Sequence, residues 1–155
     1  DPEEAMSICD KVAVMNDGRI HQIDTPINLL NNPKTIFVSS FILGNNIVNL
    51  KKNGNSYISC LGEINCSEYL KNTGIKSMSI SPKFISIKRS ESGDAIVISK
   101  EFLGEFLIYK VSINGNILRV RTDINNLLNN GDKCSLSINK NSYYFLYPGA
   151  YKEYI

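Results

Sequence analysis

The chain has 155 residues, of which 43% are hydrophobic and 21% charged, so it can bury the core of one sizeable domain or two small ones. This composition excludes intrinsic disorder, and the net charge of +2 is too close to balance for strong non-specific binding to nucleic acid. No apolar run comes near the roughly 20 residues that a membrane-spanning helix needs. The first residue is Asp1 and no signal segment follows it, so we expect a piece of a longer protein.

Three short helices are predicted in the first 44 residues, because a capping residue stands before a proline three times. We expect the second helix to cover residues 27–30, and the third to cover residues 34–42 and to end at Gly44. The three capping pairs are Asp1-Pro2, Thr25-Pro26 and Asn32-Pro33.

A β-hairpin is predicted between the first and second helices. Residues 12–15 have the pattern of a buried strand and residues 19–23 that of an alternating strand, with a turn between them. Gly18 in this turn is a structural candidate, because such turns need a residue that accepts positive φ. On the second strand we expect Ile20 and Ile23 to point inward and His21 to face solvent.

After Gly44 the apolar pattern changes to a period of two, which is typical of half-buried antiparallel strands. Turn pairs such as Asn-Gly separate the alternating runs, the clearest of which is residues 107–113. We expect about eight short strands between Ile47 and Leu146, at the spacing of a small barrel or sandwich. The chain is therefore predicted to be mainly β, with domains at residues 1–44 and 45–155.

The sequence offers little material for catalysis. It contains neither of the common glycine-rich loops that hold phosphate groups, and its single histidine, His21, lies on the predicted strand. Glu3 and Glu4 are better explained as carboxylates that stabilise the positive end of the first helix. We expect this chain to carry no catalytic residue, cofactor or metal of its own.

The cysteines indicate reduced thiols in a cytosolic protein, since none forms a Cys-x-x-Cys pair. The alternative is a zinc site, which would need Cys60 and Cys66 together with two remote partners. The four cysteines are Cys9, Cys60, Cys66 and Cys134.

The last part of the chain is rich in tyrosine. Tyr143, Phe145 and Tyr147 alternate, which predicts the packed face of a terminal strand. The alternative is a base-stacking surface that includes Tyr151 and Tyr154. Only two lysines lie near it, which is few for a groove that follows a phosphate backbone, so we expect no nucleic-acid partner.

The order of residues in the first half resembles the end of the ATP-binding subunit of ABC transporters. In that family a Thr-His-Asp-x-x-Glu-Ala stretch contains the switch histidine that contacts the nucleotide γ-phosphate. The resemblance implies that this histidine immediately precedes Asp1 and that the site for ATP and Mg²⁺ lies upstream, in the parent protein. The stretches that carry the likeness are Asp1-Pro2-Glu3-Glu4-Ala5, residues 14–22 and residues 37–42, with prolines at Pro26 and Pro33.

The second half resembles the accessory domain, called TOBE, that follows the ATPase domain in importers for polyamines, iron, sulfate, maltose and similar solutes. Its Arg-Pro-Glu stretch corresponds here to Ser81-Pro82-Lys83, and its Glu-x-Leu-Gly stretch to residues 101–104. Ser81 and Lys83 reverse the local charge of the family pattern. Leu103-Gly104 is expected at a bend, where the glycine permits a close backbone approach, as at a ligand contact, or forms an ordinary β-bulge.

The resemblance implies an OB-like β-barrel preceded by a short α/β remnant of an ATPase domain. The chain would be the C-terminal regulatory and dimerisation region of an importer's ATP-binding subunit, in the cytoplasm at the inner face of the membrane. Its partners would be a second copy that covers an exposed apolar strand face, transmembrane permease subunits and a small-molecule regulator. The alternative is a stand-alone OB-like module that binds a small oxyanion near Ser81 and Lys83.

Overall fold

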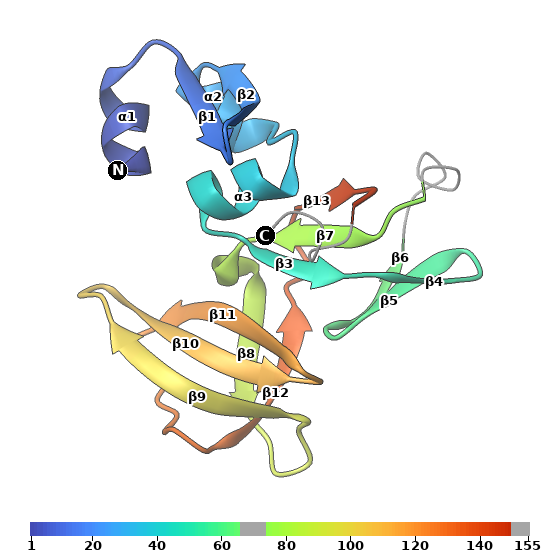
Figure 1. Cartoon of the computed structure of the whole chain (residues 1–155). Coiled ribbons are helices and arrows are strands. Elements are labelled where there is room, and N and C mark those ends of the chain that lie inside the picture. The colour runs from blue at the N-terminus through green and yellow to red at the C-terminus, as the bar shows by residue number, and fades with distance from the viewer. Residues whose placement is uncertain (66–73, 150–155) are drawn as a thin grey trace.

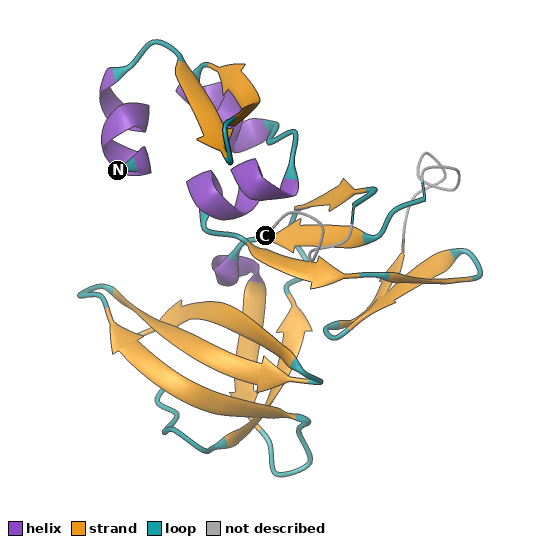
Figure 2. Ribbon diagram, in the orientation of Figure 1, coloured by secondary structure: helices purple, strands orange, loops and turns teal. Residues whose placement is uncertain are grey.

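The computed structural model describes residues 1–65 and 74–149, and it is mainly β, as predicted. Figure 2 shows the α-helices gathered in the N-terminal unit, residues 1–44, while strands form most of the rest. No helix in the described ranges is long and apolar enough to cross a membrane. The N-terminal unit contains α1 (Pro2–Ile8), β1 (Val12–Asn16), β2 (Arg19–Asp24), α2 (Pro26–Asn31) and α3 (Ile36–Leu43).

The helix starts follow the predicted capping chemistry in two cases out of three. The Asp1 carboxylate accepts a hydrogen bond from Glu3 N at 2.9 Å, and the Thr25 hydroxyl accepts one from Asn28 N at 3.4 Å. The third prediction is wrong, because α3 begins after Thr35 and not after Asn32. Thr35 has the extended backbone of an N-cap, and its hydroxyl accepts from Val38 N at 3.2 Å. Gly44, with φ of 63°, ends α3 as predicted.

The hairpin of β1 and β2 is confirmed, but its faces are the reverse of the prediction. Ile20 and Ile23 are 55% and 56% exposed, whereas Gln22 is buried. A register shift after Val14 leaves His21 as an extra residue in β2, since Val14 pairs with Gln22 and the next pair involves Ile20. The Gln22 amide bonds to Asn32 O at 3.1 Å and Lys34 N at 2.9 Å, so its burial leaves no polar group without a partner.

Two small antiparallel sheets follow Gly44. In the first, the order is β13-β7-β3, so two strands that are far apart in sequence lie on either side of β7. The second is a meander, β4-β5-β6. Their bounds are β3 (Asn46–Asn49), β4 (Lys51–Asn53), β5 (Ser56–Ser59), β6 (Gly62–Asn65), β7 (Ser77–Ile80) and β13 (Tyr144–Tyr147).

The remaining strands form a five-stranded antiparallel sheet in the order β11-β10-β9-β12-β8. Its two edge strands, β8 and β11, lie in contact, so the sheet curls into the partly open barrel that Figure 1 shows below β3. An OB-like fold is therefore confirmed, although residues 45–149 hold eleven described strands and not eight. The bounds are β8 (Ile85–Arg89), β9 (Ala95–Phe102), β10 (Phe106–Ile113), β11 (Asn116–Asp123) and β12 (Lys133–Ile138), with a 3-10 helix, η2 (Pro82–Phe84), before β8.

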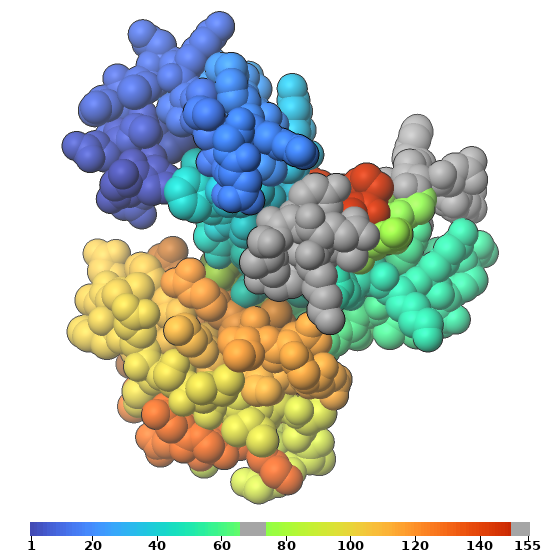
Figure 3. Space-filling view, viewed as in Figure 1, coloured from blue at the N-terminus to red at the C-terminus, as the bar shows by residue number. Residues whose placement is uncertain are grey.

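The buried apolar residues form two clusters that fall on either side of Gly44 in the sequence. The smaller cluster consists of Val14, Leu29 and Val38. The larger one runs from Val48 to Cys134 and is shared by the small sheets and the barrel. Figure 3 shows the corresponding lobes, with the blue N-terminal unit joined to the orange and yellow barrel through the teal residues of α3 and β3. The predicted apolar face of β10 is buried, namely Leu107, Tyr109, Val111 and Ile113.

Candidate functional site

The residues singled out from the sequence lie in three separate places. Gly18 is at the tip of the β1–β2 turn, where it has φ of 72° beside Asp17 at 48°, so the turn geometry accounts for it. Ser81, Pro82 and Lys83 lie between β7 and β8, and Pro82 is buried as the first residue of η2. Leu103 and Gly104 form the turn between β9 and β10. Only Ser81 and Lys83 line a common hollow.

The hollow at Ser81 lies between the N-terminal unit and the barrel and has a volume of about 360 Å³. Residues from α2 and the end of α3 form one wall, and Ser81, Lys83 and Tyr143 form the other. The main chain of η2 is fixed there, because the amides of Asn139 donate to Lys83 O at 3.3 Å and to Phe84 O at 2.9 Å. Ser81 and Lys83 therefore lie where the two lobes meet.

Lys83 also lines a second hollow of about 470 Å³ on the barrel. Its walls carry two cations, Lys83 and Arg121, and two carboxylates, Glu105 and Asp123. The Arg121 guanidinium stacks at 3.7 Å over the ring of Phe106. The charges of this second hollow therefore balance, whereas Lys83 is the charged residue among those that line the hollow at Ser81.

No described residue makes a close approach to Gly104, and a ligand contact there stays a prediction. Its φ is 82°, and a β-carbon added there would meet nothing within 4 Å, so the turn conformation alone requires glycine. The close approach occurs instead at Gly93, where an added β-carbon would lie 2.1 Å from Cys134 O. Sequence reasoning missed Gly93, because the contact joins residues 41 positions apart in the chain and leaves no local pattern.

A buried polar seam joins the two lobes, and we define it by Pro33, Ser39, Asn45, Ser79 and Tyr147. The hydroxyls of Ser39 on α3 and Ser79 on β7 hydrogen-bond to each other, and Asn45 Nδ2 donates to both, at 3.2 and 3.0 Å. Tyr147 Oη on β13 donates to Pro33 O at 2.7 Å. The seam ties the N-terminal unit to the sheet β13-β7-β3. The sequence alone did not indicate that Ser39 and Ser79 would be buried and join the two lobes.

A second tie connects β3 directly to the barrel. Asn46 Nδ2 donates to Arg119 O at 2.7 Å, and Arg119 N donates to Asn46 Oδ1 at 2.8 Å. The side chain of Asn46 thus acts like one more strand residue beside β11. Asn45 in the seam and Asn46 in this second tie directly follow Gly44, the residue at which the sequence pattern changes.

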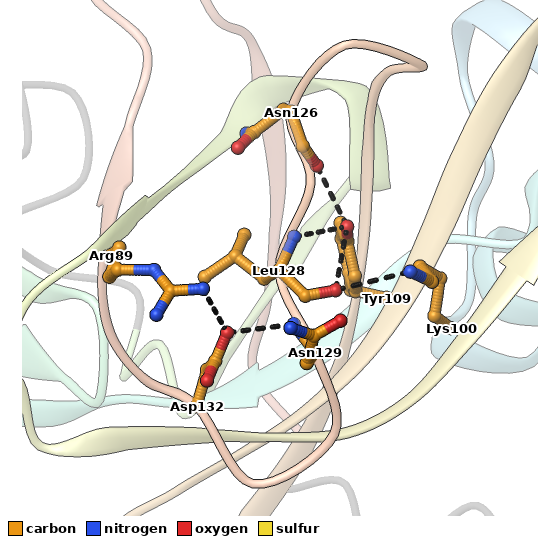
Figure 4. A network of polar contacts seen from close by, with 7 residues as sticks. All are labelled: Arg89, Lys100, Tyr109, Asn126, Leu128, Asn129 and Asp132. Atoms are coloured by element: carbon orange, nitrogen blue, oxygen red, sulfur yellow. Dashed lines mark hydrogen bonds and ion pairs between the residues drawn. The ribbon is translucent and has the colours of Figure 1, made fainter.

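A polar network inside the barrel holds the loop of residues 124–132 between β11 and β12 (Figure 4). The buried Tyr109 hydroxyl donates to Asn126 O at 2.7 Å and accepts from Leu128 N at 2.9 Å. Lys100 Nζ donates to Leu128 O at 3.3 Å, and Arg89 pairs with Asp132 across the loop. Each of these three side chains, Arg89, Lys100 and Tyr109, bonds to a residue of the loop, so the network is structural.

Among the described residues, no three His, Cys, Asp or Glu side chains form a cluster that could hold a metal ion. His21 is half-buried and not solvent-facing as predicted, with Nδ1 3.2 Å from Thr35 Oγ1 and its ring 4.9 Å from that of Phe37. Its environment is that of a packed residue.

The titratable groups with shifted pKa values have structural causes. Burial raises the pKa of the Cys60 and Cys134 thiols, which makes both less reactive, and it raises the pKa of Tyr147 to about 12. The hydrogen bond from the Asn28 side chain lowers the pKa of Asp24. Cys66, and hence the zinc alternative, lies outside the described residues.

The aromatic strand near the end of the chain is packed at one end only. Tyr147 is buried, but Tyr143 is 59% exposed and contacts the edge of Phe84, with ring centroids 4.8 Å apart. The predicted packed face therefore holds for Tyr147 and is wrong for Tyr143. Tyr151 and Tyr154 lie outside the described residues.

An apolar surface covers the outer side of the β1–β2 hairpin. We define this hairpin face by Met15, Ile20 and Ile23, each more than half exposed. Met15 and Ile20 are directly paired across the strands, and Ile23 pairs with Ala13 on the same side. Exposed apolar surface of this kind on a hairpin typically marks an interaction site.

Comparison with known proteins gives partial matches. No protein-family model matches the chain. It is 55% identical over 58 residues to the spermidine/putrescine import ATP-binding protein PotA of Bacillus anthracis, which is 37% of this chain and 17% of that protein. It is 37% identical over 97 residues to the sn-glycerol-3-phosphate import ATP-binding protein UgpC 3 of Agrobacterium fabrum, which is 61% of this chain and 27% of that protein. The chain thus spans well under two thirds of the relatives it matches.

Proposed function

We propose that this chain, which is homologous over part of its length to ATP-binding subunits of ABC importers, is the C-terminal regulatory and dimerisation region of such a subunit. The observation that carries the proposal is the 55% identity over 58 residues to an import ATP-binding protein. The relatives carry different solutes in their names, polyamines in one and a glycerol phosphate in the other, so the proposal names an importer without a solute.

The geometry of the N-terminal unit supports this proposal. Its cluster of buried residues is small, and the hairpin face of Met15, Ile20 and Ile23 is exposed. A unit of 44 residues seldom forms an independent core, so these features suit the edge of a larger domain. In the proposed subunit that domain binds ATP and Mg²⁺.

We assign no step of ATP hydrolysis to this chain. Its sequence has no phosphate-binding loop of the type Gly-x-x-x-x-Gly-Lys-Ser/Thr, and the described residues offer no cluster suited to a metal ion. We therefore place the site for ATP and Mg²⁺ in the upstream part of the proposed subunit. The switch histidine of the proposed subunit would lie immediately before Asp1.

The seam and the Asn46–Arg119 tie supply the proposed means of regulation. A barrel that is held against the ATPase domain influences it when the barrel makes different contacts in the open and closed states of the dimer. Ties at Ser39, Ser79 and Asn46 give the barrel such a defined position. The assembly would lie at the inner face of the membrane, with permease subunits as its partners.

The test compares the full protein that contains this sequence with a variant that lacks residues 45–155. We expect both to bind ATP and only the intact protein to stay dimeric without nucleotide, as measured by sedimentation velocity. If the deletion variant aggregates, Tyr147→Phe loosens the seam with the domain retained, and we expect a weaker dimer.

Two outcomes would overturn the proposal. The first is an intact protein that binds no ATP. The second is a coding region upstream of Asp1 that encodes no Gly-x-x-x-x-Gly-Lys-Ser/Thr loop.

A further inference from the structure

A hollow of about 670 Å³ lies between the first residues after α3 and the hairpin of β10 and β11. Its lining comes mainly from β3 and from the β10–β11 hairpin, which lies below β3 in Figure 1. The volume is within the range of roughly 300–1,000 Å³ that is typical of sites for small molecules. The hollow shares Asn45 with the hollow at Ser81 and no lining residue with the second hollow that Lys83 lines.

Lys110 and Arg119 are the charged residues among those that line this hollow, and no acidic residue lines it. The two are directly opposite each other in the register of β10 and β11, so their side chains leave the sheet on the same face. Like charges in this arrangement repel and destabilise the sheet. Within the described ranges, neither side chain takes part in an ion pair.

The surroundings offset this repulsion only in part. The C-terminal end of α3 lies beside Arg119, since Nη1 is 3.9 Å from the place of a β-carbon at Gly44. A helix end supplies roughly half a negative charge, which leaves most of the charge of two cations uncompensated. Glu101 on β9 pairs with Ile108, one step diagonal from Lys110, and does not line the hollow.

The other polar walls are neutral. They include Asn45 and Asn116, whose amide nitrogens donate within the protein, so that their amide oxygens are the groups that can accept hydrogen bonds from a ligand. The Asn46 amide bonds to the main chain of Arg119 on both sides and so fixes the position of that residue. A pair of cations next to several amides suits a ligand with an anionic group and a hydroxyl-bearing body.

We propose that this hollow binds a phosphate monoester of a small hydroxylated molecule. The phosphate lies between Lys110 Nζ and the Arg119 guanidinium, whose planar fork matches two phosphate oxygens, and the body meets the asparagines. Because the two cations belong to the barrel and Asn45 and Asn49 to β3 and the residue before it, the ligand bridges the barrel and the sheet β13-β7-β3. Binding itself does not depend on the proposed function.

The test is a titration of the protein, as its gene encodes it, with glucose 6-phosphate, inorganic phosphate and glucose at constant ionic strength. We expect saturable binding of glucose 6-phosphate by calorimetry, weaker binding of inorganic phosphate and none of glucose. Lys110→Gln and Arg119→Gln should each lower the affinity at least about tenfold, since hydrogen bonds to charged groups are strong. Lys88→Gln removes the same charge from an exposed position on β8 and should leave the affinity unchanged.

Absence of saturable binding overturns the proposal, and so does an equal loss of affinity in Lys110→Gln and Lys88→Gln. If Arg119→Gln does not fold, Arg119→Lys replaces it in the test, because lysine keeps the charge but lacks the planar fork. The proposal is also overturned if Arg119→Lys and Lys110→Gln both bind glucose 6-phosphate with unchanged affinity. Failure here leaves ATP binding and dimerisation untouched, so it is distinguishable from failure of the proposed function.

Discussion

Tyr147 offers a direct test of the seam, because one substitution removes its hydrogen bond. Its hydroxyl donates to Pro33 O at 2.7 Å in a buried setting. Tyr147→Phe leaves that carbonyl without its partner, and we expect the free energy of unfolding at pH 7 to fall by about 1 kcal/mol. Urea denaturation measures the change. Tyr143→Phe, at an exposed position, should have no measurable effect, and an equal effect of both would contradict the assignment.

The pH dependence of the same residue gives a second readout. Burial raises the pKa of Tyr147 from 10.0 to about 12, so the folded state holds this proton more tightly than the unfolded state. The stabilisation is complete below pH 10 and is lost as the pH rises from 10 to 12. The stability difference between the wild type and Tyr147→Phe should therefore shrink over this interval. A constant difference would show that the hydroxyl is not buried.

Gly93 and Gly104 require glycine for different reasons. At Gly93 a side chain has no space, and at Gly104 the backbone has a positive φ. Gly93→Ala should lower the free energy of unfolding by about 3 kcal/mol, because the new methyl group meets the main chain at Cys134. Gly104→Ala should cost only about 1–2 kcal/mol, the strain of a positive φ. Asparagine accepts positive φ, so Gly104→Asn should recover most of the loss and Gly93→Asn none. Thermal denaturation of the four variants measures these differences in stability. A Gly93→Asn variant more stable than Gly93→Ala would contradict the close approach at Gly93.

At the scale of elements, the attachment of β3 to β11 depends on one side chain. Asn46→Ala removes two hydrogen bonds to the main chain of Arg119, and we expect a loss of about 1–3 kcal/mol of stability. Hydrogen exchange at the Arg119 amide should accelerate more than exchange elsewhere in β11. Asn53→Ala, at an exposed position on β4, is the matched control and should leave that amide unchanged.

The elements that were predictable are those fixed by neighbouring residues. Thr25, Gly18 and Gly44 act through hydrogen bonds or φ values within a few positions, so two helix starts, the hairpin turn and the end of α3 followed from the sequence. The alternation of β10 was equally readable, because both of its faces repeat over eight residues. Short strands such as β4, three residues long, carry no such repeat and were not separated from one another.

Long-range pairing explains what the sequence did not reveal. The insertion of β12 between β9 and β8 depends on contacts between distant residues, and so do the seam serines at Ser39 and Ser79. The reversed faces of β2 come from one extra residue, His21, which shifts the alternation by one position. The hollow at Lys110 and Arg119 was missed for the same reason, since these two residues acquire meaning only from their pairing across β10 and β11.

For the whole molecule, the decisive feature is the unequal burial of its two lobes. The barrel lobe shares one large cluster with the small sheets, whereas the N-terminal unit buries four large apolar residues and leaves the hairpin face in solvent. In the proposed subunit this face packs against the rest of the ATPase domain. A chain limited to residues 1–155 has no such cover, so a second copy is the available apolar partner.

We therefore expect residues 1–155 alone to self-associate at micromolar concentration through Met15, Ile20 and Ile23. Ile20→Asp should weaken the association at least about tenfold, because burying one isoleucine contributes about 1.5–3 kcal/mol. Sedimentation equilibrium measures the change, and Ile117→Asp, equally exposed but on β11, is the control. A chain that stays monomeric contradicts the prediction. If Ile117→Asp dissociates the dimer and Ile20→Asp does not, the contact between copies belongs to the barrel, and the hairpin face is left for the ATPase domain alone.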